Sequence, residues 1–138
     1  MATKKLGQQT FALADPPSIL CGANAVGCKE REGPLADCFD YMDQDDTFGE
    51  KTWEGSERAM QKKALSLALE KGGLTVQQLD ALFAGDLLNQ CISSSFAARE
   101  QKIPFFGLYG ACSTFGEGMT LADKLLDGGF GERIGGGG

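Results

Sequence analysis

Apolar residues in the middle of the chain recur at a spacing that predicts a helix. Trp53, Met60 and Leu67 lie seven residues apart, which indicates an amphipathic helix over residues 53–71. Thr52 is a favoured capping residue at its start, and a pair of glycines follows its end. The pattern therefore places Trp53 and Met60 in the core.

Short apolar runs predict the strands around this helix. Residues 18–26, 81–85 and 104–109 are bounded by turn-forming residues, and we expect each to be a strand of one sheet. Residues 114–127 resume helical spacing, and residues 92–100 are expected to form a further helix. Strands thus alternate with helices, which is typical of an α/β domain with a parallel or mixed sheet.

Residues 27–51 separate the first predicted strand from the first predicted helix and are rich in glycine and charged side chains. Loops of this length in a compact domain are usually functional or part of an interface. Asp43, Asp45 and Asp46 resemble part of a calcium-binding loop, but the glycine and glutamate spacing of an EF-hand is missing. We therefore expect a solvated acidic loop and no metal site.

Composition and charge narrow the classes of function. The chain has 138 residues, of which 42% are hydrophobic, and this suits one folded domain. Its formal net charge of −6 disfavours binding to nucleic acids or anionic membranes, because both are polyanions. The start of the chain lacks the apolar stretch of a signal peptide, so we expect a cytoplasmic protein.

The cysteine and histidine content limits the possible chemistry. Five cysteines occur with no export signal and no CxxC spacing, which favours free thiols in a reducing compartment. The chain contains no histidine, so no Ser-His or Cys-His pair can form within it. A zinc site would have to use cysteine and carboxylate ligands alone.

The strongest candidate for chemistry is Cys112, which lies between a predicted strand and a predicted helix. The small residues Gly110 and Ala111 allow a tight turn, which would present the cysteine at the carboxyl edge of the sheet. The N-terminus of the following helix would favour a thiolate. The alternative is a buried cysteine that acts as a small hydrophobic residue, and the spacing alone leaves both interpretations open.

A second candidate is the segment that contains Asn89 and Gln90. It follows the predicted strand at 81–85, so it could line the same edge of the sheet as Cys112. The alternative is an ordinary strand-to-helix loop in which Asn89 or Gln90 caps the next helix. The sequence leaves these two interpretations open as well.

Several longer strings resemble the stage V sporulation protein AD family. They are GPL at 33–35, TWE at 52–54, AGDLLNQ at 84–90, IPF at 103–105, YGACST at 109–114 and DGGF at 127–130. The resemblance runs from residue 7 to about residue 134, and its motifs are long and specific.

The resemblance implies a thiolase-like fold, which is built from two similar βαβαβαββ halves. Residues 1–134 would then be an incomplete N-terminal half with the order βαβαβα, which ends near the start of its fourth strand, and residues 135–138 would be a glycine tail. Enzymes of this fold use a cysteine at the position of Cys112. Histidine, or histidine with asparagine, from the second half activates that cysteine.

The family implies a binding protein for dipicolinic acid that assists uptake of this compound into the forespore. Cys112, Ser113 and Thr114 would form the floor of the pocket, with Asn89 and Gln90 at its rim, and no cofactor is expected. The alternative is a ketoacyl-synthase-type acyltransferase with Cys112 as nucleophile. A third possibility is a purely structural partner of membrane sporulation proteins.

The resemblance also implies partners. The expected ligand is dipicolinic acid, free or as its calcium chelate, and the expected protein partners are other stage V sporulation membrane proteins. Full-length members of the fold commonly form homodimers. The resemblance thus implies a cytoplasmic protein that attaches peripherally to the forespore inner membrane.

Overall fold

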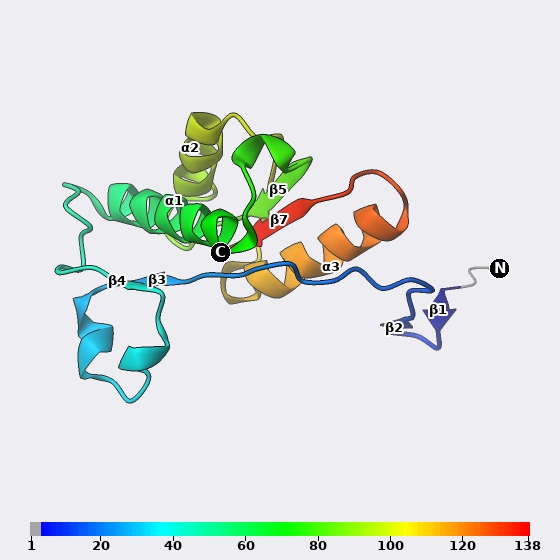
Figure 1. The fold of residues 1–138 in the computed structure, drawn as a ribbon, viewed down its shortest axis with the longest axis horizontal. Coiled ribbons are helices and arrows are strands. Elements are labelled where there is room, and N and C mark those ends of the chain that lie inside the picture. Colours follow the sequence, from blue (N-terminus) through cyan, green and yellow to red (C-terminus); the bar gives the residue numbers. More distant parts are fainter. Residues whose placement is uncertain (1–3) are drawn as a thin grey trace.

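The computed structural model describes residues 4–138, and helices cover a small parallel sheet in it (Figure 1). The α-helices are α1 (Trp53–Gly72), α2 (Ile92–Gln101) and α3 (Thr114–Asp127). Short 3₁₀ turns are η1 (Cys28–Glu32), η2 (Ala36–Cys38), η3 (Val76–Gln78) and η4 (Ala111–Ser113). The predicted helix bounds are confirmed to within a residue.

The main sheet has the order β6-β5-β7, and its strands are parallel. The strands are β5 (Ala81–Ala84), β6 (Phe105–Gly107) and β7 (Ile134–Gly137). In the register, Leu82 of β5 lies opposite Phe105 on one side and Gly135 on the other. The α/β class with a parallel sheet is therefore confirmed.

Alternation along β5 divides the core into two clusters. Leu82 and Ala84 pack on one face, with residues of α2 and the half-buried Leu65 of α1. Phe83 packs on the other face, with Leu108 and with Ala122 of α3. The sheet therefore lies between α1 and α2 on one side and α3 on the other (Figure 1).

The ends of α1 follow from its sequence. Thr52 Oγ1 accepts a hydrogen bond from the Gly55 amide at 3.1 Å, and Gly73 ends the helix with a left-handed φ of 62°. Trp53, however, is 62% exposed, so its prediction as a core residue is wrong. It lies in the first turn of α1, beyond the part of the helix that packs on the sheet.

The N-terminal third of the described chain forms two small sheets of its own. They pair β1 (Lys5–Leu6) with β2 (Thr10–Phe11) antiparallel, and β3 (Ala25–Val26) with β4 (Tyr41–Met42) parallel. The predicted strand at 18–26 is therefore wrong except for its last two residues, and it lies outside the main sheet. Side chains of Asn24 and Asp40 bind each other's backbone amides at 2.8 and 3.0 Å, which replaces ladder bonds there.

The glycine-rich end of the chain belongs to the sheet. The sequence predicted a glycine tail at 135–138, but Ile134–Gly137 forms β7 and pairs with the whole of β5. Strand pairing uses backbone groups, so glycine can take part in it. The Asp80 carboxylate fixes the entry of β7 by accepting hydrogen bonds from the amides of Glu132 and Arg133.

Candidate functional site

Two loops meet at the carboxyl edge of the main sheet. One is the rim loop, residues 85–91, which follows β5, and the other connects β6 to α3. A Cβ on Gly85 would lie 2.3 Å from the Leu108 carbonyl oxygen, so only glycine allows this approach. The Cys91 thiol donates to the same carbonyl at 3.1 Å. The two predicted site segments are therefore adjacent.

The turn that carries Cys112 is tight and strained. Ala111 has a φ of 46°, a left-handed conformation that is uncommon outside glycine. The Ser113 amide and hydroxyl both donate to the Gly110 carbonyl, at 2.9 and 2.7 Å. This turn passes directly into α3, and it leaves the Cys112 side chain exposed. The alternative of a buried structural cysteine therefore does not hold for this chain.

The two residues that follow Cys112 differ in their exposure. Ser113 is exposed, whereas Thr114 is only 2% exposed, and its buried hydroxyl has no hydrogen-bond partner among residues 4–138. Cys112 and Ser113 are thus accessible to a ligand, whereas Thr114 is enclosed. The predicted pocket floor therefore has two accessible side chains and one enclosed one.

The charge at the start of α3 is not purely positive. Glu117 lies in the first turn of the helix, and its Oε2 is 2.8 Å from where a Cβ on Gly110 would lie. A carboxylate at this place offsets part of the positive potential that a helix N-terminus provides.

The rim loop is ordered by Asp86, a residue that the sequence interpretation did not single out. The Asp86 carboxylate accepts hydrogen bonds from the amides of Cys91 and Ser94, both at 3.0 Å, and from the Ser94 hydroxyl at 2.9 Å. Burial raises the pKa of Asp86, but these hydrogen bonds outweigh it and hold the pKa below its usual range. Asp86 thus caps α2, the role that the sequence offered to Asn89 or Gln90.

Asn89 and Gln90 are both exposed. Gln90 and Cys91 have left-handed φ angles of 49° and 67°, which are unfavourable for residues with a side chain. The sequence signal for this arrangement was an aspartate between a strand and a helix start. The left-handed φ angles could not be predicted from the sequence, because neither residue is a glycine.

The structure brings the two predicted segments to one edge, but no hydrogen bond within the described part of the chain joins Cys112 to Asn89 or Gln90. A cavity of about 390 Å³ lies between the start of α1 and α2 and is lined by Arg58, Ser93 and Phe96, among others. None of the five predicted site residues lines it. The enclosure of a pocket around Cys112 is therefore not complete in these residues.

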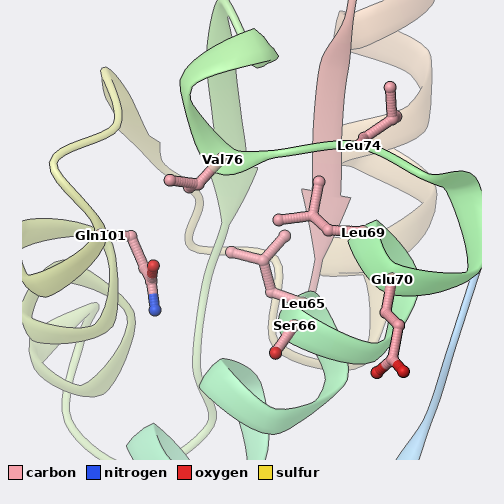
Figure 2. Close-up of a pocket in the computed structure, with 7 residues that line it drawn as sticks. All are labelled: Leu65, Ser66, Leu69, Glu70, Leu74, Val76 and Gln101. Atoms are coloured by element: carbon pink, nitrogen blue, oxygen red, sulfur yellow. The ribbon is translucent and has the colours of Figure 1, made fainter.

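A second cavity, of about 290 Å³, lies at the opposite edge of the sheet (Figure 2). It is lined by the C-terminal half of α1 and by Val76 and Gln101, which precede β5 and β6. Figure 2 shows Leu65 and Leu69 of α1 side by side in it, with Glu70 turned away. Apolar and polar side chains both line this cavity, and it contains none of the predicted site residues.

The remaining candidates are simple to place. Asp45 accepts hydrogen bonds from the amide and hydroxyl of Thr47, both at 2.7 Å, so its carboxylate orders its own loop. No group of three or more potential metal-ligating side chains occurs within residues 4–138. Nor does that part of the chain include a helix long and apolar enough to cross a membrane.

Comparison with solved structures defines the class of fold. The 3-oxoacyl-(acyl carrier protein) synthase III of Xanthomonas oryzae pv. oryzae matches with a TM-score of 0.58 and 18% identity, over 84% of this chain and 41% of the synthase. The synthase III of Aquifex aeolicus VF5 matches with a TM-score of 0.53 and 22% identity, over 62% and 28% of the two chains. At such identities the likeness shows the fold alone, and that fold is thiolase-like.

Sequence comparison is more specific. The family described as stage V sporulation protein AD (SpoVAD) matches residues 7–136. The stage V sporulation protein AD of Bacillus subtilis (strain 168) is 41% identical over 130 residues, which are 94% of this chain. This chain belongs to the stage V sporulation protein AD family. It spans 38% of the length of the Bacillus subtilis relative.

Proposed function

We propose that this chain is part of a sporulation protein that binds dipicolinic acid and assists its uptake into the forespore. The observation that carries the proposal is the meeting of the Cys112 turn and the rim loop at the carboxyl edge of a parallel sheet, in a chain of this family. Ligands of open α/β folds bind at this edge. Cys112, Ser113 and Thr114 would form the floor, with Asn89 and Gln90 at the rim.

The chemistry of the ligand explains what this chain supplies and what it lacks. Dipicolinate carries two carboxylates, which are best bound by cationic groups or by N–H donors on more than one side. The N-terminus of α3 offers donors on one side, and Glu117 beside it opposes a free dianion. The calcium chelate, whose charge is partly neutralised, suits this edge better.

The proposal extends to partners and place of action. The full-length protein would act on the cytoplasmic side, peripheral to the forespore inner membrane, together with other stage V sporulation membrane proteins. It would act as a homodimer. Family membership is the support for each of these statements.

The first prediction is that the 138 residues alone bind dipicolinate weakly or not at all. The ligand needs donors on more than one side, and this chain provides one helix end. Titration calorimetry with dipicolinate, with and without calcium, should show binding only in a chain extended to the full length of the family. Isophthalate, which lacks the ring nitrogen, is the matched control ligand. Equal affinity in both chains would show that the whole pocket lies within these residues.

The second candidate function is acyl transfer by Cys112. It is favoured by the exposed cysteine at a strand-to-helix turn in a fold shared with the synthases. Such chemistry needs a base to activate the thiol, and the chain has no histidine. A covalent acyl adduct on Cys112, found by mass spectrometry after incubation of the extended chain with acyl-coenzyme A, would favour this function over dipicolinate binding.

A further inference from the structure

The rim loop is held by α1 as well as by its own residues. Gln61 donates from Nε2 to the Gly85 carbonyl at 3.1 Å, and the Leu87 amide donates to Glu57 Oε1 at 2.9 Å. Glu57 and Gln61 are four residues apart, so they lie on one face of α1. Their two hydrogen bonds therefore fix the backbone of the loop on both sides of Asp86.

The Glu57 carboxylate makes no other hydrogen bond or ion pair within the described residues. Its second oxygen, Oε2, is buried and has no hydrogen-bond partner among the described residues. The cations beside it on α1, Arg58 and Lys62, pair with other carboxylates, including that of Glu100. A buried carboxylate oxygen without a partner is unfavourable. The contact with Leu87 is the interaction that accounts for a glutamate at this position.

The loop needs such support because it ends in strained backbone. Gln90 and Cys91 both have left-handed φ angles, which persist only where surrounding contacts impose them. The Asp86 carboxylate imposes these φ angles through its hydrogen bond to the Cys91 amide. The two hydrogen bonds from Glu57 and Gln61, called here the clamp, fix the position of Asp86. The positions of Asn89 and Gln90 are thus linked to α1 through a short series of hydrogen bonds.

We propose that Glu57, together with Gln61, is a positioning residue that holds the rim loop so that Asn89 and Gln90 face the ligand. The inference rests on the proposed binding function and adds α1 to the elements that build the site. Glu57 itself makes no contact with the ligand. It acts through the Leu87 amide.

Hydrogen exchange and dipicolinate titration of the chain extended to full family length test this role. In Glu57→Ala, we expect the amides of residues 87–91 to exchange about tenfold faster, with the amides of α1 unchanged. Affinity for dipicolinate should fall by about fivefold to tenfold, as for the loss of one ordinary hydrogen bond, because Glu57 acts on the ligand only through the loop. Glu57→Gln should restore both readouts, because its amide oxygen can accept from Leu87. Glu70→Ala, on an exposed position of the same helix, is the matched control.

Each outcome decides between the two proposals. Unchanged exchange in Glu57→Ala, or faster exchange with unchanged affinity, would overturn the positioning role. A Glu57→Gln variant that behaves like Glu57→Ala would do the same. If Glu57→Ala does not fold, Gln61→Ala breaks the other half of the clamp and replaces it. If the unaltered protein binds no dipicolinate, the proposed function fails, and the exchange comparison still decides whether Glu57 holds the loop.

Discussion

Two cysteines at the carboxyl edge of the sheet lie in opposite environments. Cys91 is buried, and burial, with a further effect of the Asp86 charge, raises the pKa of its thiol. Cys112 is exposed on a strained turn next to the start of α3. Both residues are free cysteines, so the difference in their exposure is set by the surrounding structure and not by residue type.

We predict that Cys112 is the most reactive thiol of the full-length protein. It is exposed at a helix N-terminus, whereas a hydrogen bond to Asp46 raises the pKa of the Cys28 thiol and Cys91 is enclosed. Competitive alkylation with mass-spectrometric mapping of each site measures the order of reaction. Labelling of Cys112 no faster than that of the exposed Cys38 would argue against a special environment.

The role of Glu117 can be separated in the same experiment. Its carboxylate lies in the first turn of α3 and offsets part of the positive potential of that helix end. Glu117→Gln should therefore label faster at Cys112 than the unaltered protein, while Cys38 serves as the internal reference. Identical rates would mean that Glu117 does not influence the thiol.

At the scale of elements, the start of α2 depends on one carboxylate outside the helix. The amides of Cys91 and Ser94 have no acceptor within the first turn of the helix, and the Asp86 carboxylate accepts their hydrogen bonds instead. These bonds hold the pKa of Asp86 below its usual range. A carboxyl group whose pKa is lowered by folding stabilises the folded state above its unfolded pKa of about 3.9. That contribution is lost as the pH falls through the folded-state pKa.

We predict that Asp86→Asn lowers the free energy of unfolding by about 1–2 kcal/mol at pH 7, because one of the two accepting oxygens becomes an NH2 donor and the negative charge is lost. The difference between variant and unaltered chain should shrink as the pH is lowered from 7 to 3. Urea unfolding at several pH values measures it. Asp123→Asn, on α3, is a control whose effect should be small. A difference for Asp86→Asn that is constant with pH would contradict the assignment.

The elements themselves differ in how well local sequence determines them. The helices α1 and α3 carry a repeating apolar stripe or a capping residue, and their predicted bounds are confirmed. The segment at 18–26 has strand-like composition, but its neighbours in space decide its pairing, and Ile19 and Leu20 remain exposed. Strand identity needs a partner, which local sequence does not reveal.

At the scale of the molecule, both edge strands of the main sheet are open in the described chain. The strand order places β6 at one edge and β7 at the other. Phe106 of β6 is 49% exposed, although its ring stacks on Phe83 at 4.8 Å. An uncovered strand with an apolar side chain is a site of association.

We predict that the chain self-associates through β6. Sedimentation velocity should show a concentration-dependent increase in mass, and Phe106→Lys should reduce it, because lysine on an edge strand opposes strand pairing. Phe130→Lys alters a more exposed phenylalanine, 78% exposed, in the connection from α3 to β7, and is the control. Equal association of the two variants would place the contact elsewhere.

The sequence by itself determined the alternation of helices and strands, the class of fold and the family. Each of these depends on local patterns: the apolar spacing around Met60, the capping residue Thr52 and the motif around Cys112. Helix periodicity and caps act within a few residues, so they can be interpreted along the chain. The sequence also predicted a tight turn before Cys112, but it left open whether this cysteine is exposed or buried.

Only the tertiary structure decided how the site is supported. The approach of Gly85 to Leu108, the capping of α2 by Asp86 and the clamp from Glu57 join residues that are far apart or unremarkable in the sequence. Likewise, the terminal glycines suggested a tail but form a strand, because backbone pairing with β5 needs no side chain. Hydrogen bonds between backbone groups depend on where segments meet, and residue type alone does not specify that.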